Sequence, residues 1–329
     1  MDCEASMHHN LLERILLDRS SEPTDLPLSL LKEITNNFSD DQQVGKGGFA
    51  IVYKGLLQNG TVAVKKLFQT LEMHETKFAQ EVACLMRVRH KYIVRFLGYC
   101  ADTEAKITNH KGKLVMAEVR ERLLCFEFMP NGSLDGYITD ASQGLEWKTR
   151  YQLIKGICEG LHYLHQKNIV HLDLKPANIL LDYNMVPKIA GFGLSRCFDE
   201  KQSRAITSKL VGSLGYLAPE FYSGEITLKL DIYSLGVIII EILTGQKGYF
   251  HIEKVLESWS KRFETSQGDR DTQLQQIKVC AEIGLECMDS NPEKRPITEC
   301  INEMLDEIES RCSFVETDTC TSRLIHVSS

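Results

Sequence analysis

The stretch that decides the fold is HLDLKPANILLD, residues 171–182, which is followed closely by PKIAGFG, residues 187–193. The first segment places Asp173 and Asn178 five residues apart in a polar loop, directly before an apolar run that is typical of a strand. Any loop can hold one aspartate and one asparagine. The spacing H-x-D-L-K-P-x-N with a strand behind it is much more specific. Asp173, Lys175 and Asn178 are therefore the first candidates for chemistry.

Composition and charge describe an ordinary globular chain. Its 329 residues are 43% hydrophobic, enough for one large core or two lobes. The net charge of −7 disfavours nucleic acid or an anionic membrane as the main partner, although local basic patches remain open. The eleven cysteines form no zinc-type cluster, which predicts reduced thiols. Because the N-terminus has no signal-peptide pattern and the most apolar run, residues 235–243, is too short to span a bilayer, we expect a cytoplasmic protein; peripheral attachment at the plasma membrane stays open.

A glycine-rich segment upstream predicts a nucleotide-binding loop. Residues 43–55, QVGKGGFAIVYKG, and residues 61–67, TVAVKKL, are short β-type runs. Gly45 and Gly47 would let backbone N–H groups approach phosphates closely. The loop alone is a weak signal, but Lys65 on the next strand, at a fitting distance, makes the pair a strong one.

Residues 75–88 predict an amphipathic helix. Glu81 lies beside its apolar face. This carboxylate could pair with Lys65, or it could form a solvent-exposed i,i+4 pair with Lys77. Lys65 and the downstream loop together favour the first pairing. The apolar face is formed by Phe78, Val82, Leu85 and Met86.

The order of these motifs resembles that of protein kinases, most closely the plant receptor-like and receptor-like cytoplasmic kinases of the Pelle group. The resemblance covers about residues 36–310, and CFEFMPNGSL, residues 125–134, is similar to the hinge of that group. It implies an α+β, bilobal protein kinase fold with a β-rich N-lobe and a mainly helical C-lobe. The expected parts are an N-terminal extension at 1–36, the N-lobe and hinge at 37–129, the C-lobe at 130–312 and a disordered tail at 313–329.

The resemblance gives each candidate residue a role. Asp173 would accept the proton of the substrate hydroxyl, Lys175 indicates the serine/threonine type, and Asn178 would hold a magnesium ion. Asp231 would anchor the catalytic-loop backbone, and Arg295 would pair with Glu220. Phe126 would be the gatekeeper beside the adenine. The implied ATP-binding residues are Val44, Gly45, Gly47, Val52, Ala63, Lys65, Glu81, Phe126, Glu127, Met129 and Leu180.

The segment from residue 171 to residue 193 departs from the kinase pattern at two positions. Leu172 replaces the arginine of H-R-D, which implies the non-RD type, in which activation-loop phosphorylation is not sensed in the common way. Gly191 replaces the magnesium-binding aspartate of D-F-G, and residues 188–196 contain no acid that could substitute. Losing one such contact typically costs about 3 kcal/mol, or about two orders of magnitude in rate. Weak or absent Mg²⁺ binding is therefore expected. The candidate phosphosites are Ser203, Thr207, Ser208 and Ser213.

Two further segments carry less specific signals. Residues 1–36 hold two helix-like patterns, which we expect to pack on the lobe or to fray; a docking helix for a partner has no support. Residues 101–121 are a polar insert, which predicts a surface loop or a longer hairpin.

Two functions follow from the resemblance. The favoured one is a nucleotide-binding pseudokinase that acts as a switch, scaffold or decoy in plant defence signalling. The alternative is an active serine/threonine kinase, weakened by Gly191, that transfers the ATP γ-phosphate to protein hydroxyls. The expected cofactors are ATP and weakly held Mg²⁺. The expected partners are signalling proteins, such as an immune receptor, another kinase or a pathogen effector, with no nucleic acid and no transmembrane segment.

Overall fold

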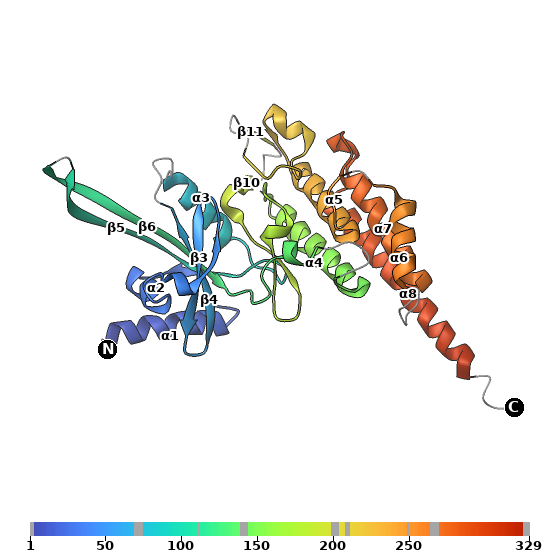
Figure 1. Cartoon of the computed structure of the whole chain (residues 1–329), viewed down its shortest axis with the longest axis horizontal. Helices are drawn as coiled ribbons and strands as arrows, with labels where there is room; N and C mark the ends of the chain where they lie inside the picture. Colours follow the sequence, from blue (N-terminus) through green and yellow to red (C-terminus); the bar gives the residue numbers. More distant parts are fainter. Residues whose placement is uncertain are drawn as a thin grey trace. The chain divides into compact units, whose positions relative to one another are not determined.

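The computed structural model describes residues 3–68, 75–110, 112–138, 144–198, 204–207, 211–248, 250–263 and 270–324 (Figure 1). The chain divides into two compact units. Unit 1 comprises Met1–His90 with Val94–Pro130, and unit 2 comprises Lys91–Ile93 with Asn131–Ser329. Unit 1 is built on a β-sheet and unit 2 mainly on helices. This division confirms the expected α+β class.

Unit 1 contains a six-stranded sheet in the order β1-β5-β6-β4-β3-β2, antiparallel except for the β1/β5 pair. Successive side chains of a strand point to opposite faces. In β4, Val62 and Val64 are therefore buried on one face, while Ala63 and Lys65 lie on the other. The elements of this unit's sheet and its third helix are β1 (Thr24–Asp25), β2 (Gln43–Lys46), β3 (Ala50–Leu57), β4 (Gly60–Leu67), α3 (Glu75–Met86), β5 (Phe96–His110) and β6 (Lys113–Glu127).

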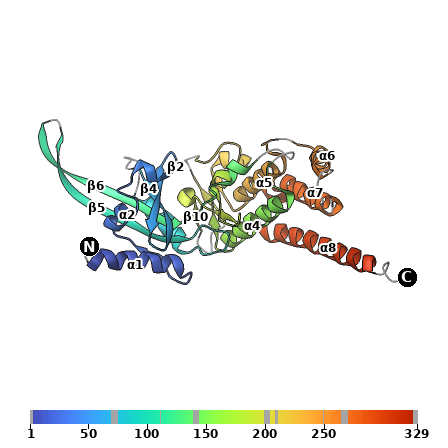
Figure 2. The same cartoon turned by 60° about the horizontal axis from the view of Figure 1, so that its bottom comes forward.

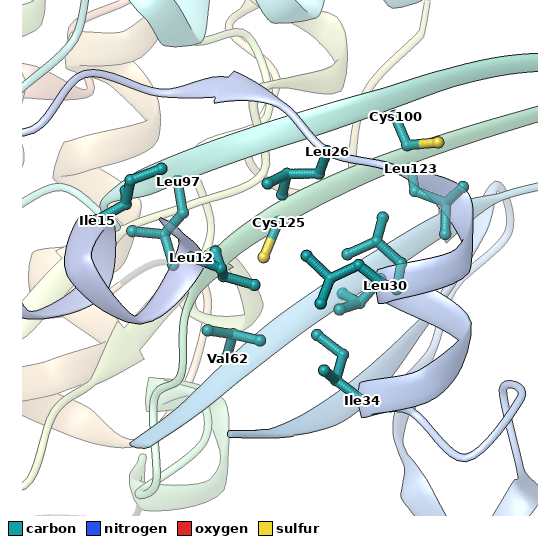
Figure 3. Close-up of a cluster of buried hydrophobic side chains, with 12 residues drawn as sticks. Leu12, Ile15, Leu26, Leu30, Ile34, Val62, Leu97, Cys100, Leu123 and Cys125 are labelled. Carbon is teal, nitrogen blue, oxygen red and sulfur yellow. The ribbon is translucent and has the colours of Figure 1, made fainter. Parts of the chain in front are cut away.

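The N-terminal extension forms two helices, α1 (Cys3–Leu17) and α2 (Leu28–Ile34), that pack on the buried face of this sheet. Figure 3 shows their leucine and isoleucine side chains gathered with residues of the strands. Full burial of such a side chain contributes about 1.5–3 kcal/mol. Of the two outcomes expected for the extension, the structure shows packing on the sheet of unit 1. The cluster consists of Leu12, Ile15, Leu26, Leu30, Leu31, Ile34, Val62, Val64, Leu97, Cys100, Leu123 and Cys125.

Two polar contacts fix α1 to the strands. Glu13 reaches the β3–β4 turn, where its carboxylate accepts the backbone N–H groups of Gln58 and Asn59 at 2.8 and 3.2 Å and the Asn59 side-chain amide at 2.8 Å. The Arg95 guanidinium donates to the carbonyl oxygens of Ile15, Leu16 and Asp18, at the C-terminal end of the helix. The last carbonyls of a helix have no partners within it, so Arg95 satisfies them.

We expect Glu13→Gln to lower the unfolding free energy by about 1 kcal/mol at neutral pH, because a neutral amide accepts hydrogen bonds less strongly than a carboxylate. The Asn59 side-chain hydrogen bond is the main cause of the lowered pKa of Glu13. The stabilisation is therefore present above the unfolded-state pKa and disappears as pH falls through the folded-state value. Thermal unfolding followed by circular dichroism should show that the stabilities of the wild type and Glu13→Gln differ at neutral pH and become equal in acid. The control is Glu104→Gln, which changes an exposed acid of the same sheet. A stability difference between the wild type and Glu13→Gln that is as large in acid as at neutral pH would contradict the prediction.

The insert at residues 101–121 is a hairpin. Strands β5 and β6 pair continuously from Cys100 and Leu123 to His110 and Lys113. Figures 1 and 2 both show the two strands side by side, extending past the other strands of unit 1. Of the two expected alternatives, the longer hairpin is the one that forms.

In its described residues, unit 2 consists of helices and three short strand pairs. The apolar run at 235–243 lies in a buried helix. The last helix continues to Leu324, into the segment for which disorder was expected. The helices are α4 (Trp147–Gln166), α5 (Lys229–Thr244), α6 (Ile252–Phe263), α7 (Arg270–Cys287) and α8 (Thr298–Leu324). The strand pairs are β7 (Ile169–Val170) with β10 (Arg196–Cys197), β8 (Ile179–Leu181) with β9 (Pro187–Ile189), and β11 (Ala205–Ile206) with β12 (Glu225–Ile226).

The cysteines differ from expectation at two positions. Cys84 and Cys197 are disulfide-bonded, so the prediction that all cysteines are reduced thiols is wrong there. The free ones include Cys100, Cys125 and Cys158, whose pKa values burial raises to about 11, 12 and 12, which makes them poor nucleophiles. In the described part of the chain, no helix combines the length and apolar character needed to span a membrane.

Candidate functional site

Four candidate residues of unit 1 lie on the sheet face opposite the N-terminal helices. In the register, Val52 stands opposite Lys65, and Ala63 stands opposite Phe126. Directly opposed residues share a face, as do residues two apart in one strand. These four side chains therefore line one face, while Val62 and Val64 are buried against α1 and α2. The same register places Lys54, which stands opposite Ala63, on this face. The sheet thus presents Lys65 and Lys54 beside apolar and aromatic groups.

The glycine-rich segment joins β2 to β3. Gly45 pairs with Val52, and the Gly47 N–H donates to the Ala50 carbonyl at 2.9 Å. Neither glycine has a positive φ, so neither position needs glycine for its backbone dihedrals. What the glycines provide is space, because a Cβ added at either position would meet no atom closer than 3.9 Å. Val44, next to Gly45, is 51% exposed.

Lys65 and Glu81 form a close ion pair. The Lys65 Nζ lies 2.8 Å from Glu81 Oε1, and the Glu81 side chain is only 7% exposed. The structure therefore shows the pairing across β4 and α3, and not the solvent-exposed Lys77 pair. Helix α3 is held for this contact by Arg122 of β6, whose Nε and Nη2 donate to the two oxygens of Glu75 at 3.1 and 2.9 Å.

The three hinge candidates are placed at the end of β6 and just after it. The Phe126 ring lies 5.5 Å from that of Phe96. The Glu127 N–H donates to the Arg95 carbonyl at 3.0 Å, and its carboxylate accepts the Arg95 N–H at 2.9 Å. The Glu127 N–H is therefore already hydrogen-bonded to the segment that precedes β5. Met129 is buried.

In unit 2, Asp231 of α5 anchors the start of the loop that carries Asp173, as predicted. Its fully buried carboxylate accepts the N–H groups of His171 and Leu172 at 2.7 and 2.9 Å. A buried charge is costly unless it is hydrogen-bonded in this way. Leu172 has φ 66°, which is strained for a residue with a side chain, and the contact holds it there. Burial lowers the pKa of His171, whose Nε2–H donates to the Ala190 carbonyl at 2.8 Å.

The three catalytic candidates come together around Asp173. Lys175 Nζ lies 2.9 Å from Asp173 Oδ2, and Asn178 Nδ2 donates to Asp173 Oδ2 at 2.9 Å and to its carbonyl at 2.7 Å. Sequence reasoning missed a fourth member, Ser213, which it treated only as a phosphosite. The Ser213 hydroxyl donates to Asp173 Oδ1 at 2.7 Å and accepts from Lys175 at 2.6 Å. No local signal marks this contact, because forty residues separate Ser213 from Asp173.

Gly191 lies against Asn178. It has φ 84°, and a Cβ added there would lie 2.6 Å from Asn178 Cγ. The Asn178 side chain thus fills the space beside Gly191. Magnesium prefers several hard oxygen ligands, usually including carboxylates. The residues grouped here offer one amide and one carboxylate, Asp173, that is already paired with a cation, so they fit a tight Mg²⁺ site poorly.

The remaining predicted residues also lie in unit 2. Leu180 is on β8, paired with Lys188 of β9. Arg295 and Glu220 form the predicted ion pair, with two parallel contacts of 2.6 and 2.8 Å. Two of the candidate phosphosites, Ser203 and Ser208, lie outside the described residues.

Comparison with known proteins agrees with this arrangement. The model of the protein kinase domain family matches residues 38–307. Cysteine-rich receptor-like protein kinase 7 of Arabidopsis thaliana is 38% identical over 86% of this chain and 44% of its own length. Cysteine-rich receptor-like protein kinase 6 of Oryza sativa subsp. japonica is 36% identical over 85% of this chain and 41% of its own. Receptor-like serine/threonine-protein kinase SD1-7 of Arabidopsis thaliana is 36% identical over 88% of this chain and 36% of its own length. The chain spans less than half of each of these relatives, and it belongs to the protein kinase domain family.

Proposed function

We propose that this chain is a nucleotide-binding pseudokinase, a kinase domain that retains the ATP-contacting residues but transfers phosphate poorly. The observation that carries the proposal is Gly191, with Asn178 occupying the space beside it. In this reading Gly191 takes the position of the aspartate that bridges magnesium to the phosphates. The loss of that contact lowers the rate by about two orders of magnitude or more.

Nucleotide binding is proposed for the face of unit 1 that carries Lys65. A lysine held by a buried glutamate at 2.8 Å is oriented in advance, which reduces the entropy lost when it meets a phosphate. The open glycine segment and the apolar groups Val52 and Ala63 support the same assignment. ATP, when bound, supplies the γ-phosphoryl group; Mg²⁺ is held weakly, because the carboxylate at 191 is missing.

A weak serine/threonine kinase is the second candidate, and one observation favours it. Asp173, Lys175 and Ser213 form a closed hydrogen-bonded group, which is the arrangement needed to orient a substrate hydroxyl. Leu172 packs against an apolar cluster that includes Val170 and Phe221 and brings no positive charge to the loop. Neither function therefore depends on an arginine at position 172 that would bind a phosphorylated activation loop.

The cellular role is proposed from the resemblance to plant receptor-like kinases. The chain acts in the cytoplasm as a switch, scaffold or decoy in defence signalling. Its partners are other signalling proteins, such as an immune receptor, a second kinase or a pathogen effector.

Lys65→Met is expected to weaken ATP binding at least about tenfold, because a charge-assisted contact to the phosphates is lost. Thermal shift with ATP, in EDTA and in Mg²⁺, measures this effect. Lys66→Met is the matched control, since Lys66 is the next residue of β4 and pairs with Glu121 at 3.0 Å. The wild type should bind ATP in both buffers, and the control should bind as the wild type does.

Phosphotransfer is assayed with the same preparations. The proposal requires that autophosphorylation by the wild type, with Mg²⁺ and with Mn²⁺, be about two orders of magnitude slower than that of Gly191→Asp. A wild-type rate comparable to that of Gly191→Asp, and abolished in Asp173→Asn, would overturn the pseudokinase assignment and establish the second candidate.

A further inference from the structure

The outer part of the β5–β6 hairpin pairs only with itself among the described residues. Strand β4 pairs with β6 from Leu123 onward, and β1 pairs with β5 at Gly98 and Tyr99. From residue 101 to the turn, the two strands form a ribbon about 30 Å long whose backbone pairs with no other described strand, although Arg122 and Glu121 at its base contact α3 and β4. A two-stranded ribbon is marginally stable in water. Its turn is tight: Gly112 has φ 81° and donates its N–H to Asn109 Oδ1 at 2.8 Å.

One face of the ribbon tip is apolar and exposed. Ile107 stands opposite Met116, and Asn109 stands opposite Leu114. Because residues two apart share a face, Ile107, Leu114 and Met116 form one patch. Their side chains are exposed to 71%, 77% and 73%. Single exposed apolar residues need no explanation, whereas three on one face at the end of a projecting element indicate contact with a partner.

The other face is basic. Lys106 and Lys113 each lie one residue from the patch and therefore point to the opposite side of the ribbon. The thirteen residues between Glu104 and Glu118 contain three lysines and no acid, in a chain whose net charge is −7. Lys106 contacts Glu104 at 3.0 Å, but both side chains are more than half exposed, so the pair neutralises little. The partner should therefore be anionic.

We propose that the tip of the β5–β6 hairpin docks on an anionic lipid bilayer. The ribbon lies in the interface, with Ile107, Leu114 and Met116 at the boundary of headgroups and acyl chains. The stems of Lys106 and Lys113 extend back to the lipid headgroups, as lysine side chains do at membrane surfaces. The arrangement is the β-ribbon equivalent of an amphipathic interfacial helix.

The geometry favours a bilayer over an acidic protein. A stable protein interface buries about 800 Å² on each partner with close shape complementarity. One face of a ribbon only two strands wide, with strands about 5 Å apart, offers much less. A bilayer imposes no complementary shape, and apolar insertion and lysine attraction add to each other there. Interfacial depth also leaves the open backbone edges of the ribbon in water, which the hydrocarbon core would not allow.

Vesicle co-sedimentation of the full chain tests the proposal, with phosphatidylcholine vesicles compared with vesicles that also contain phosphatidylserine. The wild type should bind the anionic vesicles at least about tenfold more tightly. Lys106→Glu/Lys113→Glu should weaken that binding by more than about tenfold, since each lysine near the surface contributes roughly fivefold. Ile107→Ser/Leu114→Ser/Met116→Ser should also weaken it by at least tenfold. Tyr183→Ser/Ile206→Ser, exposed to 78% and 87%, is the apolar control and should bind as the wild type does.

A second readout reports insertion directly. The two tryptophans, Trp147 and Trp259, are buried in unit 2, so a new tryptophan in Ile107→Trp can be followed against a constant background. Its emission should shift to the blue with the anionic vesicles and be quenched by brominated acyl chains. Equal affinity of the wild type for both vesicles, unchanged binding by the tip variants, or an unshifted tryptophan would each overturn the proposal.

Discussion

Gly191→Asp is expected to raise the rate of autophosphorylation by about 100-fold or more over the wild type. The new carboxylate restores one preorganised electrostatic contact, worth about 3 kcal/mol in the transition state, or about two decades in rate. An aspartate can adopt the positive φ of position 191 at lower cost than most residues. A radiometric assay with Mg²⁺ measures the gain, with each preparation at equal concentration.

The gain should depend on Asn178. A Cβ at position 191 would lie 2.6–2.7 Å from three atoms of the Asn178 side chain, so that side chain must turn away. In turning, it gives up its hydrogen bonds to Asp173. The amide oxygen then becomes available beside the new carboxylate. Gly191→Asp/Asn178→Ala should therefore lose most of the gain.

Gly191→Ala is the matched control. It adds the same Cβ and the same displacement of Asn178 without a carboxylate, so it should show no gain and a loss of stability of about 1–2 kcal/mol from the strained φ. A comparable gain in Gly191→Ala would mean that release of Asn178, and not the carboxylate, restores activity. Equal rates in wild type and Gly191→Asp would remove the central argument for a pseudokinase.

Short-range patterns predicted much of the candidate site. Asp173, Lys175 and Asn178 lie within six residues of one loop, so their spacing alone placed them together. The partner of Glu81 was less certain from sequence, because Lys77 is nearer in the chain. The alternation of β4 resolves it, since Val62 and Val64 face α1 and α2 and Lys65 must face the other way. The alternation of the strand therefore agrees with the pairing that the motifs favoured, whereas the i,i+4 spacing of the helix pointed to Lys77.

Long-range contacts could not be predicted in the same way. Ser213 meets Asp173 across forty residues, and Glu13 meets the β3–β4 turn across about forty-five. Serine and glutamate are common in exposed segments, so neither residue type points to a buried polar contact. The hairpin at 101–121 lacks the apolar alternation of a half-buried strand, which agrees with its exposure: among the described residues, most of its side chains are exposed or only partly buried. Its pairing is set by the strand residues on either side, Cys100 and Leu123, which are buried in the core of unit 1.

Arg295→Ala is expected to lower the unfolding free energy of unit 2 by about 3–5 kcal/mol. Arg295 is 1% exposed, and its guanidinium contacts both oxygens of Glu220 as well as the carbonyls of Asp289 and Lys229. Removing it leaves a carboxylate and two carbonyl oxygens without their donor in a buried place. Urea unfolding followed by tryptophan fluorescence isolates this effect, because both tryptophans of the chain belong to unit 2.

A second variant separates the ion pair from the packing around it. Arg295→Met/Glu220→Leu removes both charges and keeps most of the volume, so it should be less destabilising than Arg295→Ala, although the backbone carbonyls still lose their donor. Lys261→Ala, which breaks an exposed ion pair with Glu257, should leave the midpoint of urea unfolding unchanged within error. If Arg295→Ala were no worse than Lys261→Ala, the buried pair would not be what stabilises this unit. If Arg295→Met/Glu220→Leu were more destabilising than Arg295→Ala, the attraction between the two charges would stabilise unit 2 by more than their desolvation costs.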